Sequence, residues 1–122
     1  MIHILLVDEV ASVRQGVRMR LALEPDLVVV REAGNGAEAL QLAAKLQPDV
    51  VVTGIRFPEL DGIAMTARLR LDFPNCAVVI LSLYDDAFNR ERALQAGAAF
   101  FVSKQESDTI LVEAIRLAAT TK

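Results

Sequence analysis

The chain has 122 residues, enough for one domain with a single hydrophobic core and too few for two. Its net charge is −3 and its 13 Lys and Arg residues are scattered, which argues against direct nucleic-acid binding. Cys76 is the only cysteine, so an internal disulfide and a thiolate metal cluster are excluded, and a buried thiol in a reducing cytoplasm is expected. The apolar N-terminus lacks the charged region of a signal peptide and soon reaches acidic residues, so neither secretion nor a membrane span is predicted.

Apolar runs alternate five times with helix-like segments along the chain. Runs that are apolar throughout are typical of strands buried on both faces, as in a parallel sheet covered by helices. The predicted fold class is therefore α/β, with helices on both faces of a five-stranded parallel sheet. The predicted strands are Ile2–Val7, Leu27–Glu32, Val50–Gly54, Ala77–Leu81 and Ala99–Val102.

The segments between these strands carry helical signals. In the first segment Val13, Val17 and Leu21 share one face, and we expect Arg14 and Arg18 to turn outward. Candidate helix ends follow from residues that favour caps. They are Asn35 before the second helix, Asp85 or Asp86 before the fourth, Ser107 before the fifth, and Gly97 after the fourth.

Four polar or unusual positions follow the predicted strand ends, where open parallel sheets bind their ligands. Asp8, Gly54, Ser82 and Lys104 each lie at or just past such an end, so we expect them to meet at one crevice. Asp8 is followed by Glu9, and adjacent acids repel each other unless a cation is near. Mg²⁺ suits such a pair, because it takes one or two carboxylates together with water and phosphate oxygens. The alternative is a solvated acidic loop that also caps the first helix.

Ser82 and Lys104 have the chemistry to recognise a phosphoryl group, the first by donating a hydrogen bond and the second by neutralising charge. Their plainer interpretations are a turn residue and a solvated charge. A hydrolase is not favoured, because the chain has no Gly-x-Ser-x-Gly motif and its one histidine, His3, lies within the first strand. We therefore predict that the chain is not an enzyme.

Gly54 is the position that does not fit its surroundings. Glycine weakens a strand by roughly 0.5–1 kcal/mol relative to alanine, and it supplies no nucleophile. Its alternative interpretation is a bulge or a close backbone approach. Thr53 is not expected to replace the missing group, since its side chain points to the opposite face, and Ser82 is a weak nucleophile without a base.

The chain resembles the receiver domain of two-component response regulators, in particular the LuxR/FixJ/NarL type. The resemblance covers essentially the whole chain and implies a flavodoxin-like, doubly wound fold. The residues that carry it are Ile4-Leu5-Leu6-Val7-Asp8-Glu9, Val13-Arg14-Gln15-Gly16-Val17-Arg18, Glu32-Ala33-Gly34-Asn35-Gly36, Pro48-Asp49-Val50-Val51, Ile55-Arg56-Phe57-Pro58, Leu60-Asp61-Gly62, Leu81-Ser82-Leu83-Tyr84-Asp85-Asp86 and Ala96-Gly97-Ala98.

The resemblance assigns roles to individual positions. It implies that Asp8, Glu9 and the main-chain carbonyl of Arg56 hold Mg²⁺, and that Ser82 and Lys104 sense the phosphoryl group.

Two further positions match by resemblance. Phe101 matches the aromatic switch position, and Gly54 stands where the family has its phosphoacceptor aspartate. Without that carboxylate we expect weak Mg²⁺ binding, no phosphorylation at residue 54, and a Lys104 that turns to Asp8 instead.

The interpretation is a receiver domain, residues 1–122, that is inactivated or acts independently of phosphorylation, in other words a pseudo-receiver. By resemblance its partners are a histidine kinase and, through the face of the fourth helix, fifth strand and fifth helix, a second copy or an output domain. A helix-turn-helix output domain is expected to be absent from this chain, so a role in transcription is inferred from the family alone.

Two alternatives stay open: phosphorylation of Thr53 or Ser82, and a stand-alone module that binds a ligand or protein. Phe88, Phe100 and Phe101 add either apolar surface near the fourth helix or, more commonly, core.

Overall fold

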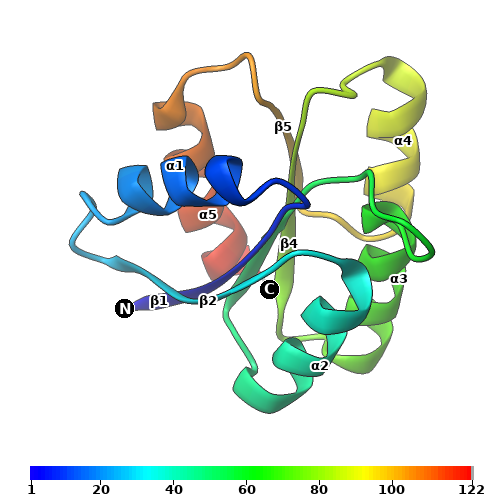
Figure 1. Cartoon of the computed structure of the whole chain (residues 1–122), viewed down its shortest axis with the longest axis horizontal. Helices are drawn as coiled ribbons and strands as arrows, with labels where there is room; N and C mark the ends of the chain where they lie inside the picture. The colour runs from blue at the N-terminus through cyan, green and yellow to red at the C-terminus, as the bar shows by residue number, and fades with distance from the viewer. Residues whose placement is uncertain (122) are drawn as a thin grey trace.

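The computed structural model describes residues 1–121, in which strands and helices alternate along the chain (Figure 1). The strands are β1 Ile2–Val7, β2 Leu27–Ala33, β3 Val50–Thr53, β4 Ala77–Ser82 and β5 Phe100–Ser103. The helices are α1 Ala11–Leu21, α2 Gly36–Leu46, α3 Gly62–Asp72, α4 Ala87–Gln95 and α5 Asp108–Thr121.

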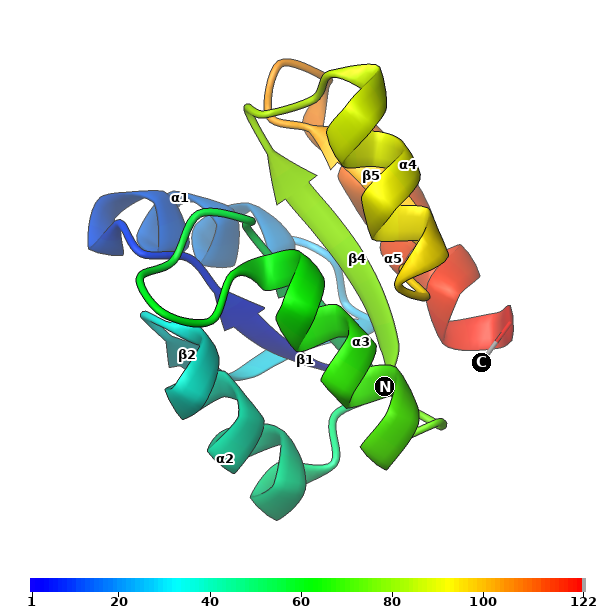
Figure 2. The same cartoon turned by 90° about the vertical axis from the view of Figure 1, so that its right-hand side faces the viewer.

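The five strands form one parallel sheet in the order β2-β1-β3-β4-β5. Helices α1 and α5 lie on one face of this sheet, and α2, α3 and α4 lie on the other (Figures 1 and 2). This is the doubly wound, flavodoxin-like order, in which ligands bind beyond the carboxyl ends of the central strands. The predicted fold class is confirmed.

The predicted strand bounds were close, with differences of one residue at several ends. The structure ends β3 at Thr53, so Gly54 begins the loop instead of closing the strand, although its N–H still donates to the carbonyl of Val7 at 3.0 Å. Ser82 belongs to β4, and β5 starts at Phe100.

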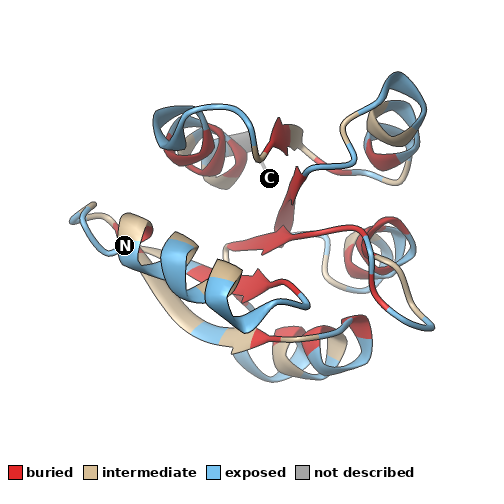
Figure 3. Cartoon of the chain, turned by 45° about the horizontal axis from the view of Figure 1, so that its top comes forward, coloured by how far each residue is buried: buried red, intermediate tan, exposed pale blue. Residues whose placement is uncertain are grey.

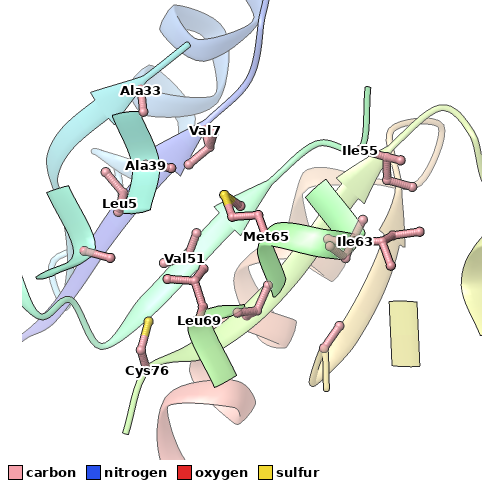
Figure 4. Packing of buried hydrophobic residues seen from close by; sticks show 14 of the residues in the cluster. Leu5, Val7, Ala33, Ala39, Val51, Ile55, Ile63, Met65, Leu69 and Cys76 are labelled. Atoms are coloured by element: carbon pink, nitrogen blue, oxygen red, sulfur yellow. The ribbon is translucent and has the colours of Figure 1, made fainter. Parts of the chain in front are cut away.

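Alternation of side chains along the strands divides the core into two clusters. Leu5, Val51 and Ile80 face α2, α3 and α4, where they pack with Met65 and Leu69 (Figure 4). The side chains that alternate with these in the same strands point to the opposite face, where they pack with Leu21 of α1 and with α5. Strands β3 and β4 are buried throughout (Figure 3), which explains why they read as continuous apolar runs.

The structure confirms the predicted helix ends at three positions. Asn35 accepts a hydrogen bond from the N–H of Glu38 at the start of α2, and Asp86, not Asp85, caps α4. Gly97 has a φ of +109°, the left-handed conformation expected after α4.

The phenylalanines divide between core and surface. Phe100 and Phe101 are partly buried, each against a different core cluster, whereas Phe88 on α4 is 69% exposed. Cys76, immediately before β4, is buried as predicted. Within the described residues no helix is both long enough and apolar enough to cross a membrane.

Candidate functional site: a crevice at the carboxyl end of the sheet

Asp8 is the buried centre of the crevice. It follows β1 directly and is 3% exposed. Its Oδ1 accepts a hydrogen bond from the N–H of Val10 at 2.9 Å, and its Oδ2 accepts one from Nζ of Lys104 at 2.8 Å. Its main-chain carbonyl accepts a further bond from the guanidinium of Arg14. Each oxygen of Asp8 therefore has a donor within the protein.

The expectation that Arg14 turns outward was wrong. The side chain is 19% exposed, and while one guanidinium nitrogen binds the carbonyl of Asp8, Nε donates to Glu32 of β2 at 3.2 Å. Arg18 is 51% exposed and also reaches Glu32, at 3.4 Å. The helical pattern gives the position of Arg14 next to the apolar face of α1. It does not show that the long side chain reaches the carbonyl of Asp8 and the carboxylate of Glu32.

The surroundings of Gly54 would accept a Cβ atom without a clash. A Cβ built on this residue would lie 3.6 Å from Oδ2 of Asp8, 3.7 Å from Oε2 of Glu9 and 3.9 Å from the carbonyl of Leu81, all ordinary contact distances. Gly62 differs, because a Cβ there would lie 1.9 Å from the carbonyl oxygen of Gly54. The close-approach interpretation of Gly54 is therefore not supported, and a Cβ atom fits at this position.

The hydroxyls of Thr53 and Ser82 are both buried and both engaged. Thr53 donates to the carbonyl of Gly54 at 3.0 Å. Ser82 accepts from the N–H of Tyr84 at 2.9 Å, and this N–H is a donor that cannot serve as a base. Neither contact activates a hydroxyl as a nucleophile.

Lys104 closes the crevice from the β5 side. Its main-chain N–H donates to the carbonyl of Ser82 at 3.0 Å, and its ammonium reaches Asp8 beyond β1. The predicted pairing of Lys104 with Asp8 is confirmed. The structure thus brings Asp8, Glu9, Gly54 and Lys104 together, with Ser82 at the adjoining strand end.

Arg56 and Tyr84 form a contact that the sequence analysis did not find. The guanidinium carbon of Arg56 lies 4.3 Å from the centre of the Tyr84 ring, a cation–π contact between the loops that follow β3 and β4. Arg56 stands three positions after Thr53, the last residue of β3, and Tyr84 two positions after Ser82, the last residue of β4, so no shared spacing in the sequence indicated the contact. The role of the Arg56 main-chain carbonyl stays a prediction.

Phe101, the predicted switch aromatic, is partly buried against the cluster beneath α4. The guanidinium of Arg90 lies 4.9 Å from the centre of its ring, and Arg90 also binds the carbonyl of Asp85 and approaches Glu106 at 3.6 Å. The ring therefore packs against the core cluster on one side and contacts Arg90 of α4. Its role as a switch stays a prediction.

The donor set fits a magnesium ion poorly. Asp8 and Glu9 supply two carboxylates near one point, but among the described residues no group of three or more His, Cys, Asp or Glu side chains could hold a metal. One oxygen of Asp8 is already bound to the ammonium of Lys104. Mg²⁺ takes hard oxygen ligands in near-octahedral geometry, and a neighbouring ammonium opposes it.

Comparison with known protein families identifies the family to which the chain belongs. Residues 4–116 match the model of the response regulator receiver domain. The chain belongs to the response regulator receiver family. Receiver domains of this family generally bind Mg²⁺ at an acidic pocket, and those of LuxR-type regulators interact with histidine kinases.

Among curated proteins, the chain is 37% identical over 120 residues to the transcriptional regulatory protein UhpA of Salmonella typhimurium, covering 98% of this chain and 60% of that protein. It is 32% identical to DegU of Brevibacillus brevis, covering 97% of this chain and 50% of that protein. The chain thus spans about half to three fifths of the length of these relatives.

Solved structures agree on the fold. A two-component response regulator of the LuxR family from Aurantimonas sp. superposes with a TM-score of 0.95 at 30% identity, covering 100% of this chain and 87% of that one. The signal receiver domain of NarL from Mycobacterium tuberculosis gives 0.93 at 32% identity, covering 99% of this chain and 98% of that one.

Proposed function

We propose that this chain is a receiver domain that works without phosphorylation at the usual position. Gly54 occupies the place of the phosphoacceptor aspartate, and the supporting observation is the geometry around it. A Cβ on Gly54 would face Asp8 and Glu9 at 3.6–3.7 Å, so the acid pair surrounds a position that carries no side chain. An acyl phosphate needs a carboxylate nucleophile, and glycine has none.

The remaining positions of the crevice carry the residue types that the family uses. Ser82 and Lys104 are the proposed phosphoryl-sensing residues, and Phe101 is the proposed switch aromatic. Asp8, Glu9 and the main-chain carbonyl of Arg56 are the proposed ligands of Mg²⁺, with weak affinity because the third carboxylate is absent. When bound, the ion would supply positive charge next to phosphate oxygens. In its absence Lys104 supplies positive charge at Asp8.

The chain is proposed to act by binding partners, as part of a regulator of transcription and not as an enzyme. This rests on relatives that are transcriptional response regulators. The proposed partners are a histidine kinase and a second copy or an output domain. The contact face is α4, β5 and α5, where Phe88 is largely exposed beside Arg92, whose guanidinium lies 5.4 Å from the ring centre.

Beryllofluoride, which mimics a phosphoryl group bound to a carboxylate, tests this function. Amide spectra of the chain and of Gly54→Asp should be recorded with and without beryllofluoride and Mg²⁺. We expect no change for the chain itself, and shifts near Ser82, Phe101 and Lys104 for Gly54→Asp. Equal shifts in both proteins would show that the crevice accepts a phosphoryl group without an aspartate, and would favour Thr53 or Ser82 as the acceptor.

A further inference from the structure

The ion pair between Lys104 and Asp8 affects how the crevice binds metal ions, in addition to the missing nucleophile at Gly54. We propose that Lys104 is the permanent counter-ion of the acid pair and fills the electrostatic role of a divalent cation. The inference rests on the proposed function in one respect: it takes Asp8 and Glu9 as the place where the family binds its metal ion. It concerns metal binding, however, and does not depend on whether any residue is phosphorylated.

The hydrogen bonds of Asp8 are the first support. Its carboxylate is 5% exposed and holds two donors, the N–H of Val10 on Oδ1 and the ammonium of Lys104 on Oδ2. A metal ion that binds Oδ2 must first displace this ammonium or share the oxygen with it. Buried ion pairs with short, charge-assisted bonds resist such exchange, because the displaced charge loses its partner.

The charge of the crevice is the second support. Asp8 and Glu9 contribute two negative charges and Lys104 one positive charge, so the three side chains together carry −1. A divalent cation is therefore attracted by less charge here than at two unpaired carboxylates, and it is repelled by the ammonium. Without Lys104 the same acid pair would carry −2.

The path of the lysine is the third support. In the sheet, β3 and β4 lie between β1 and β5, so Lys104 must reach past the ends of both strands to contact Asp8. Gly54 follows β3, and a Cβ atom on it would lie 3.6 Å from Oδ2 of Asp8, the oxygen that Lys104 binds. A carboxylate at position 54 would compete with Asp8 for the ammonium. The glycine and the Lys104–Asp8 pair are therefore parts of one arrangement.

One consequence is mechanical. The ion pair connects the loop after β1 to the loop between β5 and α5, and Arg14 extends the connection to Glu32 on β2. A metal ion is not needed to hold these loops together. The β5–α5 loop should keep one arrangement whether or not divalent cations are present.

Mn²⁺ is a suitable probe, because the electron paramagnetic resonance signal of the free ion disappears on binding. Four proteins should be titrated: the unmodified chain, Lys104→Met, Lys104→Met with Asp8→Asn, and Lys45→Met. Lys45 is an exposed lysine in the last turn of α2, so its replacement removes the same charge away from the crevice.

We expect Lys104→Met to bind Mn²⁺ at least tenfold more tightly than the unmodified chain, and Lys45→Met to match the unmodified chain. Adding Asp8→Asn to Lys104→Met should abolish this gain in Mn²⁺ affinity. Broadening of the Gly54 amide signal by Mn²⁺ locates the ion, and Lys104→Gln replaces Lys104→Met if the methionine variant does not fold. The inference is wrong if Lys104→Met binds no more tightly than Lys45→Met, or if the gain survives Asp8→Asn. Phosphoryl incorporation does not enter this readout, so the inference and the proposed function can fail separately.

Discussion

The ammonium nitrogen of Lys104 lies 2.8 Å from Oδ2 of Asp8, joining residues 96 positions apart in the chain. This contact ties the carboxyl ends of the first and last strands together. The same oxygen of Asp8 would lie 3.6 Å from a Cβ atom on Gly54, which follows β3.

Replacing Lys104 by methionine should destabilise the fold. The variant keeps most of the unbranched apolar part of the side chain but leaves a buried carboxylate at Asp8 without its charged partner, which costs about 1–3 kcal/mol of unfolding free energy. Urea unfolding in metal-free buffer measures the change. Lys45→Met should stay within about 0.5 kcal/mol of the unmodified chain. Equal stability of the two variants would mean that the ion pair contributes nothing.

Alanine should be tolerated at Gly54 and not at Gly62. At Gly54 the new Cβ makes ordinary contacts, so the variant should gain about 0.4–1 kcal/mol through reduced freedom of the unfolded chain. At Gly62 the Cβ would overlap the carbonyl oxygen of Gly54, and the cost should be about 1–3 kcal/mol. Thermal melting of both variants tests the contrast. A loss of stability in Gly54→Ala would show that the glycine has a structural role.

Aspartate at Gly54 should make stability depend on Mg²⁺. The new carboxylate would lie next to Asp8 and Glu9, so repulsion should lower the melting temperature in the presence of a chelator. Mg²⁺ should restore it, because three carboxylates form a better site than two. The unmodified chain should melt at nearly the same temperature with and without Mg²⁺. The prediction is contradicted if adding Mg²⁺ leaves the melting temperature of both proteins unchanged.

Arg116 should make stability depend on pH in the acid range. It binds Asp26 through two bonds of 2.8 and 2.9 Å and Glu24 at 2.7 Å, which connects α5 to the loop before β2. Hydrogen bonding to Arg116 lowers the pKa of Asp26 below its ordinary 3.8, and Arg20 together with Arg116 lowers the pKa of Glu24 below 4.5.

Because these pKa values are lower in the folded state, the stabilisation is complete above about pH 4.5 and is lost as the pH falls through the folded-state values. Arg116→Gln should therefore be less stable than the unmodified chain at pH 6, with a smaller difference at pH 3. Unfolding curves at both pH values provide the test. A difference that does not change with pH would exclude the two carboxylates as its source.

Much of the fold could be predicted from the sequence, since its determinants are local. The strands of the centre are apolar on both sides because helices cover both faces, and Asn35 and Gly97 mark helix ends through their own backbone preferences. The crevice could be predicted in outline because parallel strands place their carboxyl ends at one edge.

The details that the sequence could not supply involve long side chains that act far from their own position. Arg14 was expected in solvent and instead binds Asp8 and Glu32. The stacking of Arg56 on Tyr84 connects two loops whose relative positions depend on the whole sheet. Helical and strand periodicities describe where a Cα–Cβ bond points, and they do not specify where a guanidinium ends.

The most direct test of the central claim is intact mass after incubation with acetyl phosphate and Mg²⁺, on this chain and on Gly54→Asp side by side. We expect only Gly54→Asp to gain a phosphoryl group, which would show a working receiver crevice that lacks its nucleophile alone. A phosphoryl group on the unmodified chain would contradict this account, because it would require an acceptor other than residue 54. If neither protein gains one, the crevice has lost more than its acceptor, and the claim that Gly54 is the single missing part is wrong.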